Sequence, residues 1–242
     1  MKKALSFILL FIPVLTFAMS FPYGSVMNFN PAYMVYNKNW SISYEMYFGK
    51  NESDLLIFQP FKDGFAGKIG LYTFGATSGV AYSVATKAGN LNIGSDFLIS
   101  NYGTDLSVTL GLGMVEQISQ NFDLSVRMPQ VLTYTYQKGI SVYPNFEAGV
   151  NFLNAYWNAG AFLSIGQMVS GGVLANLSIF NFQILARLSG GYVPQIPSLS
   201  QNSFDLNVES SIGSISFAYL YRNAWGTYNP EQLNGFRVSA KW

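Results

Sequence analysis

The sequence predicts an all-β protein: a transmembrane antiparallel up-and-down β-barrel of about fourteen strands, within a range of about 12 to 16. Three observations predict this fold. Half of the residues are hydrophobic and 17% are aromatic, but only 10% are charged, against about 25% in average soluble domains. From Trp40 onward, apolar and polar residues alternate with the period of a two-faced strand. Polar or charged residues interrupt every later apolar run, so no transmembrane helix is expected there.

The first 18 residues have the features of an export signal in the expected order along the chain. Two lysines precede an apolar stretch from Leu5 to Leu15, and Thr16 and Ala18 supply small residues for a peptidase. An uncleaved membrane anchor is the rival interpretation, although the apolar stretch is short for a span of about 20 residues. The predicted parts of the chain are a signal peptide over 1–18 (alternatively 1–20), an N-terminal plug segment over 19–39 and the barrel over 40–242.

The segment 21–36 is crowded with bulky apolar side chains, yet it shows no alternation, and its two prolines discourage a strand. Such a stretch would be an aggregation risk if it were exposed. A barrel of about fourteen strands has space for one extended segment. We therefore expect a plug in the lumen; the rival is a stretch that binds a periplasmic partner or lies along the membrane surface. The predicted plug residues are Phe21, Tyr23, Phe29, Asn30, Pro31, Ala32 and Tyr33.

Alternation defines the strands in chain order. It is clearest in "LSVTLGLGM", where five apolar residues from Leu106 to Met114 oppose Ser, Thr and Gly. Two segments are ambiguous: 54–61 is apolar on both faces, and in 130–137 the preceding Pro129 is expected to mark a bulge. The other predicted strand segments are 40–48, 65–73, 80–87, 91–100, 106–114, 122–128, 142–152, 156–166, 172–180, 182–189, 204–209, 215–222 and 235–242.

A soluble sandwich or propeller is the alternative fold for so many short strands. The polar face argues against it, because that face is poor in charge and rich in Ser, Gly, Asn and Thr, as a confined lumen would be. Aromatic residues also stand near strand ends, as in the interfacial girdles of membrane barrels. Examples are Trp40, Phe48, Phe236 and Trp242.

The connections are expected to alternate in length. Turns such as 62–64 and 88–90 are tight, whereas "VPQIPSLSQNS" and "NAWGTYNPEQLN" are interpreted as longer loops. Outer-membrane barrels have short periplasmic turns and longer external loops. With an even number of strands both termini lie on the periplasmic side, so the first, third and last connections are external. The longer connections fall at these odd-numbered positions, as an even number of strands requires.

The last residues, Gly235 to Trp242, continue the strand pattern to the final tryptophan. Because an open sheet edge cannot survive in lipid, this strand is expected to pair with the first one and close the barrel. An alternating terminal strand that ends in an aromatic residue also resembles the signal read by the barrel-assembly machinery of outer membranes, which implies that machinery as a partner. The residues of this assembly signal are Phe236, Val238, Ala240 and Trp242.

The composition excludes the usual catalytic and metal centres. The chain has no histidine and no cysteine, so Ser-His-Asp triads, zinc-histidine sites and disulfides are impossible. A net charge of +1 gives no indication of a nucleic-acid partner. Asp205 and Glu209 share one strand face but lie about 13 Å apart, beyond the roughly 5–9.5 Å of glycosidase carboxylates. We expect no enzyme activity and no cofactor.

Charged residues within the strands all fall on the polar face. Both signs occur, so a structural network of ion pairs across the lumen is one interpretation, and a functional constriction for ions or polar solutes is the other. The charged residues predicted to face the lumen are Glu45, Lys68, Asp96, Asp123, Arg127, Glu147, Arg187, Asp205, Glu209, Arg222 and Arg237.

One short motif adds a resemblance. "NFNPAY", Asn28 to Tyr33, resembles the Asn-Pro-Ala element near the mature N-terminus of FadL-like and PorV/PorQ-like barrels. Asn30, Pro31 and Ala32 carry the resemblance. It implies a fourteen-stranded barrel in which the N-terminal stretch forms a hatch inside the lumen.

The sequence therefore predicts a small barrel in the outer membrane of a diderm bacterium, surrounded by the lipid bilayer. Its expected role is that of a passive, partly plugged channel for small apolar or amphipathic molecules. The alternative is a structural or anchoring outer-membrane barrel with a sealed lumen.

Overall fold

The structure is a computed structural model that describes residues 30–102, 105–142, 145–154, 156–166, 168–227 and 230–242. The predicted signal peptide lies outside the described residues, as do Phe21, Tyr23 and Phe29 of the predicted plug. None of the helices in the described part of the chain is long and apolar enough to cross a membrane.

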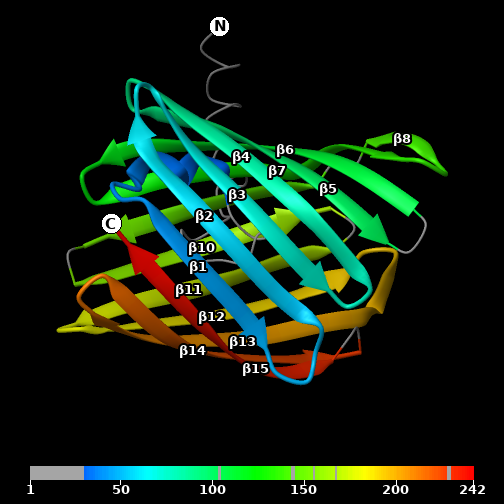
Figure 1. Cartoon of the computed structure of the whole chain (residues 1–242). Helices are drawn as coiled ribbons and strands as arrows, with labels where there is room; N and C mark the ends of the chain where they lie inside the picture. The colour runs from blue at the N-terminus through cyan, green and yellow to red at the C-terminus, as the bar shows by residue number, and fades with distance from the viewer. Residues whose placement is uncertain (1–29, 103–104, 143–144, 155, 167, 228–229) are drawn as a thin grey trace, which may run out of the picture.

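The described residues form a short 3₁₀ helix followed by one antiparallel sheet of 15 strands (Figure 1). The elements are η2 (Pro31–Tyr36), β1 (Ser41–Tyr47), β2 (Glu52–Lys62), β3 (Phe65–Phe74), β4 (Thr77–Ala88), β5 (Leu91–Tyr102), β6 (Asp105–Ser119), β7 (Phe122–Thr135), β8 (Gly139–Val142), β9 (Phe146–Leu153), β10 (Trp157–Ile165), β11 (Val169–Ile179), β12 (Phe182–Val193), β13 (Ile196–Ile212), β14 (Ile215–Gly226) and β15 (Glu231–Lys241).

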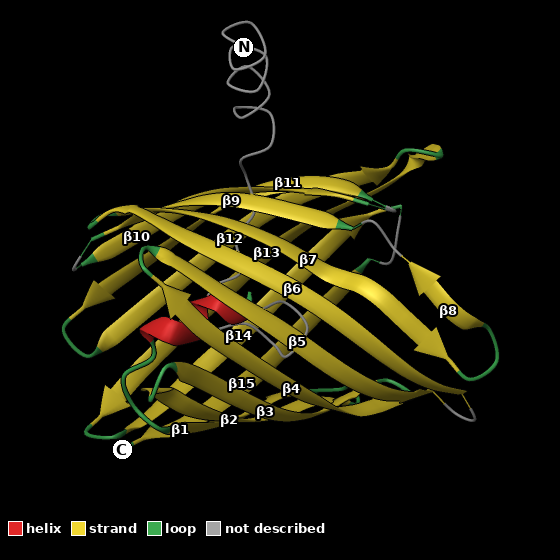
Figure 2. Cartoon of the chain, turned by 90° about the horizontal axis from the view of Figure 1, so that it is seen from above, coloured by secondary structure: helices red, strands yellow, loops and turns green. Residues whose placement is uncertain are grey.

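The sheet closes on itself. The last strand, β15, pairs with β1 so that Val238 lies opposite Tyr44, and β6 pairs with β7 to complete the circuit. Among the residues that the structure describes, the short strand β8 pairs with the end of β7 alone, while the start of β7 pairs with β9. The barrel therefore has fourteen strands with β8 as an extra one, which confirms the predicted fold (Figures 1 and 2).

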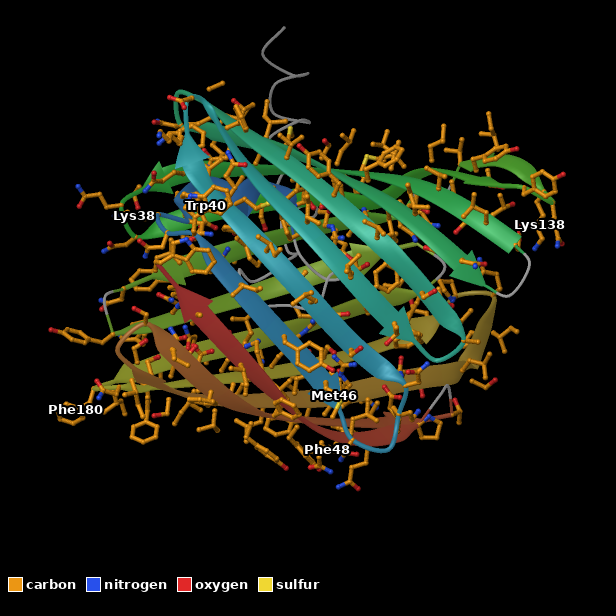
Figure 3. All side chains as sticks on the ribbon, viewed as in Figure 1. Lys38, Trp40, Met46, Phe48, Lys138 and Phe180 are labelled. Carbon is orange, nitrogen blue, oxygen red and sulfur yellow. The ribbon has the colours of Figure 1, made fainter. Side chains whose placement is uncertain are left out.

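The two faces of the strands have the predicted environments. On β3, Ile69 is 50% exposed whereas the adjacent Lys68 is 2% exposed. The same contrast recurs around the barrel, and side chains such as Phe48 and Phe180 project away from it (Figure 3). Because large apolar side chains cover the outside, this surface suits the hydrocarbon core of a bilayer.

Both ambiguous segments are strands. The strand β2 covers 54–61, and the part of it next to η2 is apolar on the inside because Phe58 and Phe61 pack against the cluster around η2. The bulge expected at Pro129 is confirmed, since the register of β6 and β7 shifts between Leu110 and Leu112. The strand continues beyond the bulge to Thr135. The ambiguity of β2 therefore came from its contact with η2 inside the barrel, which makes inward side chains apolar as well.

The prediction of long loops at "VPQIPSLSQNS" and "NAWGTYNPEQLN" is wrong, because strands cover most of both segments. Only residues 194–195 separate β12 from β13, and β14 and β15 cover most of "NAWGTYNPEQLN". The prediction placed Pro197 in a loop, but proline is tolerated at the start of a strand, where its missing N–H leaves no ladder bond unmade. The backbone at Ser200 and Thr227 then continues the pairing of β13 with its neighbours. The exception is the connection of β7 to β9, which forms β8.

Candidate functional site: the lumen

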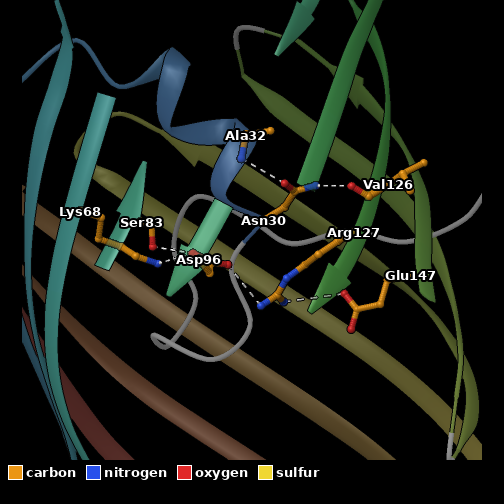
Figure 4. Close-up of polar contacts among 8 residues, drawn as sticks. All are labelled: Asn30, Ala32, Lys68, Ser83, Asp96, Val126, Arg127 and Glu147. Carbon is orange, nitrogen blue, oxygen red and sulfur yellow. Dashed lines mark hydrogen bonds and ion pairs between the residues drawn. The ribbon is translucent and has the colours of Figure 1, made fainter. Parts of the chain in front are cut away.

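The lumen is occupied at one end by η2. Asn30 begins this helix: its side-chain oxygen accepts a hydrogen bond of 3.1 Å from the backbone N–H of Ala32, as an N-cap residue does. Its side-chain nitrogen donates to the backbone carbonyls of Met114 (3.3 Å) and Val126 (3.2 Å). Figure 4 shows Asn30 between the helix and β7. The residue that caps η2 therefore also joins the helix to the barrel wall.

The wall beneath η2 is built of small residues. Ala66, Ala85 and Val115 are buried in one cluster with four residues of the helix. A Cβ added to Gly94 would stand 2.6 Å from the backbone nitrogen of Ala32, and one added to Gly113 would stand 2.9 Å from Cγ of Asn30. Such approaches are closer than atoms tolerate, so these glycines provide the space in which η2 lies. Figure 2 shows the helix enclosed by the strands.

A buried polar triad holds the helix on the opposite side. The hydroxyl of Tyr33 donates a hydrogen bond of 2.8 Å to a carboxylate oxygen of Asp123, which also accepts one of 2.6 Å from the side-chain amide of Asn151. Burial, together with the negative charge of Asp123, raises the pKa of Tyr33 well above its ordinary value. The phenol therefore keeps its proton and remains a donor.

Beyond the helix the lumen contains a cavity of about 750 Å³. One wall is mostly apolar: Tyr72, Ala81 and Leu98 line it and form a cluster with Leu56. The hydroxyl of Tyr72 lies 2.6 Å from that of Ser100, so its polar end is satisfied within the wall. The other walls are polar and charged. The cavity can therefore contact both an apolar and a charged part of one small molecule.

An ion-pair network crosses the strands between β3 and β9. Lys68 and Arg127 lie 3.9 Å and 3.7 Å from the carboxylate of Asp96, and Arg127 lies 3.8 Å from that of Glu147 (Figure 4). The hydroxyl of Ser83 donates a bond of 2.5 Å to Asp96. These contacts join charges from four strands that are remote in sequence.

A second group of ion pairs lies on β13, β14, β15 and β1. Arg237 is 3.5 Å from Glu45 and 2.9 Å from Glu209, so two carboxylates share one guanidinium. Arg222 is 2.9 Å from Asp205. Each of these three acidic residues therefore forms an ion pair with one of the two arginines.

The structure places every predicted luminal charge but divides them into separate groups. Apart from the pairs above, Asp123 belongs to the triad with Tyr33, and the guanidinium of Arg187 lies 4.6 Å from the centre of the Phe162 ring. Asp205 and Glu209 each contact an arginine rather than facing one another as a catalytic pair. In the described part of the chain no group of acidic side chains could hold a metal ion.

Sequence reasoning missed two carboxylates of the cavity, Glu52 and Asp54. Both lie on β2, the strand whose two faces could not be distinguished. The period-two spacing of Glu52, Asp54 and Leu56 could have placed them on one face, since Leu56 is buried inside the barrel.

No family model matches the sequence, and no curated protein matches it. Among solved structures the chain is similar to the CymD monoaromatic hydrocarbon channel, with 9% identity, a TM-score of 0.70, and coverage of 93% of this chain and 95% of that one. It is also similar to CdiB from Acinetobacter baumannii, with 10% identity, a TM-score of 0.54, and coverage of 85% and 60%. The predicted resemblance to fourteen-stranded outer-membrane barrels is confirmed at the level of the fold.

Proposed function

We propose that the protein is a passive outer-membrane channel for small apolar or amphipathic molecules. The observation that carries this proposal is the cavity of about 750 Å³, with its apolar wall at Tyr72 and Leu98. Cavities of this size accommodate small organic molecules. The described strands supply paired charges but no catalytic arrangement, so we infer a role in passage rather than in chemistry.

The proposed location follows from the surface. The outward side chains are apolar over most of the barrel, and a lipid bilayer would cover them. The channel name of CymD supports passage of a small apolar solute as a hypothesis for this chain. We further propose export by a signal peptide over residues 1–18 and insertion by the barrel-assembly machinery through the terminal strand β15.

We propose that the N-terminal segment obstructs this channel. Its described part, Asn30 to Tyr36, lies inside the barrel and is anchored by Asn30 and Tyr33. A segment held by a few polar contacts can obstruct one end of the lumen while the cavity at the other end stays accessible.

A sealed structural barrel is the second candidate. It is favoured by the same helix and by the ion pairs of Arg127 and Arg237, which could close the lumen without any passage.

Planar-bilayer conductance separates the two candidates. The purified barrel, shown to be folded by circular dichroism, should give discrete openings in potassium chloride. Liposome swelling should then show uptake of small solutes. A folded barrel that inserts but never conducts would contradict the channel and favour the sealed barrel.

A further inference from the structure

We propose that one half of the barrel rim at the η2 end is inserted into the lipid headgroups, with Phe180 as its anchoring residue. This inference concerns an interaction surface and does not depend on the passage of any solute. Three features carry it: the uneven chemistry of the turns, the backbone conformation of Phe180, and the continuity of this half with the surface that faces lipid.

The turns at the η2 end of the barrel form one continuous rim. The backbone N–H of Ser178 donates a hydrogen bond of 2.7 Å to the carbonyl of Tyr156. The N–H of Ser211 donates one of 3.0 Å to the carbonyl of Asn181. These bonds join the turns that follow β9, β11 and β13. Because neighbouring strands lie about 4.8 Å apart, the tips of adjacent hairpins are spaced by about 10 Å and can contact one surface together.

The rim is charged on one half and apolar on the other. In and beside the turns that follow β2, β4 and β6 stand the charged residues Lys62, Asp63, Lys87 and Glu116. The segments 152–158, 178–184 and 210–216, which contain the other three turns, have no charged residue. We call these three segments the apolar half-rim. Their most exposed large apolar side chains are Tyr156 (72%), Phe180 (102%) and Ile212 (75%).

Phe180 has a backbone conformation that is unusual for a bulky residue. Its φ is 52°, and Asp63, with a φ of 54°, is the only other non-glycine residue with positive φ in the described part of the chain. Glycine and short polar residues tolerate this region, and the turn after β13 has Gly213 there. The ring of Phe180 gains no compensating packing, because it projects from the barrel and is fully exposed (Figure 3). Folding of the turn alone therefore does not account for an aromatic residue at this position.

The apolar half-rim is continuous with the surface that faces lipid. Phe182 is the first residue of β12 and Ile215 is the first of β14, and both are exposed on the outside of the barrel. The apolar surface of these strands therefore extends onto the tips of their turns. On the other half of the rim the apolar surface ends at Phe65, because the charged Asp63 lies at the tip of that turn.

Lipid headgroups suit the apolar half-rim better than a protein partner does. Tyr156 and Trp157 belong to it, and tyrosine and tryptophan prefer the interface between membrane and water. The bilayer that covers the adjoining strands can cover these tips as well. A barrel with one apolar and one charged half of its rim is stabilised by tilting, because tilting buries the apolar half and leaves the charged half in water. The apolar half-rim therefore lies deeper in the membrane than Asp63.

Single cysteines measure the depth of the two halves, since the chain has no cysteine of its own. Ser214→Cys reports on the apolar half-rim and keeps Phe180, and Asp63→Cys is the matched site on the charged half. Each full chain is labelled with a nitroxide and reconstituted in vesicles of phosphatidylethanolamine and phosphatidylglycerol. Electron paramagnetic resonance then gives the depth of the label from its accessibility to oxygen and to nickel–EDDA. The label at position 214 should lie about 5–10 Å deeper than the label at position 63.

A second substitution tests Phe180 itself. Phe180→Asn introduces a residue that tolerates the left-handed conformation, so the turn should still form. In the chain labelled at Ser214→Cys it should raise the accessibility to nickel–EDDA by about twofold or more, since the tip loses its largest apolar side chain. Phe65→Asn is the control, because it removes the same ring from the charged half and should leave that accessibility unchanged. Circular dichroism checks the fold, and Ile212→Asn replaces Phe180→Asn if that variant does not fold.

Each outcome bears on one part of the inference. Equal depths for the two labels would overturn the insertion of the apolar half-rim. A label at position 214 that is as accessible to nickel–EDDA as a label in water would also overturn it and would favour a protein partner for this surface. An unchanged depth after Phe180→Asn would overturn the anchoring role of Phe180. None of these measurements requires a current, so a barrel that does not conduct would overturn the channel function and leave this inference standing.

Discussion

The two ends of the lumen are built on the same alternation but have opposite interiors. At one end, Ala66, Ala85 and Gly113 leave space that η2 fills, and polar contacts are few and buried. At the other end, larger polar and charged side chains line an open cavity of about 750 Å³. The size of the inward side chains, rather than the alternation along the strands, therefore decides which part of this barrel is filled.

The strongest test of this contrast places one large cation at each end. Ala85→Arg should lower the free energy of unfolding in lipid vesicles by about 3–5 kcal/mol, because a buried charge would replace a methyl group packed against η2. Thr109→Arg, in the open cavity, should cost within about 1 kcal/mol. Denaturant titration of both variants measures the difference. Equal costs would break the distinction between a filled and an open end.

A slightly smaller effect is expected on the outer face. Leu110 is adjacent to Thr109 but points to the opposite side of β6, where it pairs with the exposed Phe97. Leu110→Arg should cost about 2–4 kcal/mol, as for arginine facing the bilayer midplane. The same titration applies. A smaller cost for Leu110→Arg than for Thr109→Arg would reverse the assignment of inside and outside.

The barrel could be predicted because successive residues of each strand face lipid and lumen in turn. The apolar and polar residues of a short stretch of sequence therefore show both environments. The features that sequence reasoning missed depend on remote contacts. The inner face of β2 was ambiguous because Phe58 packs on η2, and Glu52 and Asp54 were overlooked with it. The parity of the strands placed Arg127 and Arg237 in the lumen, but their partners depend on the register of strands far apart in sequence.

A glycine substitution tests the fit of the filled end. Gly113→Ala should cost about 1–3 kcal/mol, because its Cβ would overlap Asn30 and the helix would have to shift. Gly67→Ala is the control, since its Cβ would meet its nearest atom at an ordinary distance of 3.5 Å. If thermal unfolding of the two variants were indistinguishable, the close fit of η2 would be contradicted.

The smallest expected effect concerns the buried triad. Tyr33→Phe removes one hydrogen bond from Asp123 while Asn151 still donates to the same carboxylate. We expect a loss of about 1–2 kcal/mol. Limited proteolysis at the N-terminal segment should also become faster. A variant as stable and as resistant as the wild type would show that this contact does not hold the helix.

The most direct test of the central claim, that the N-terminal segment obstructs a passage, compares the full chain with a variant that lacks residues 21–36. The deletion removes all of η2 and leaves the strands and the cavity intact. Planar-bilayer recording of both folded proteins should show larger or more frequent openings in the deletion. Unchanged conductance in a correctly folded variant would contradict the account.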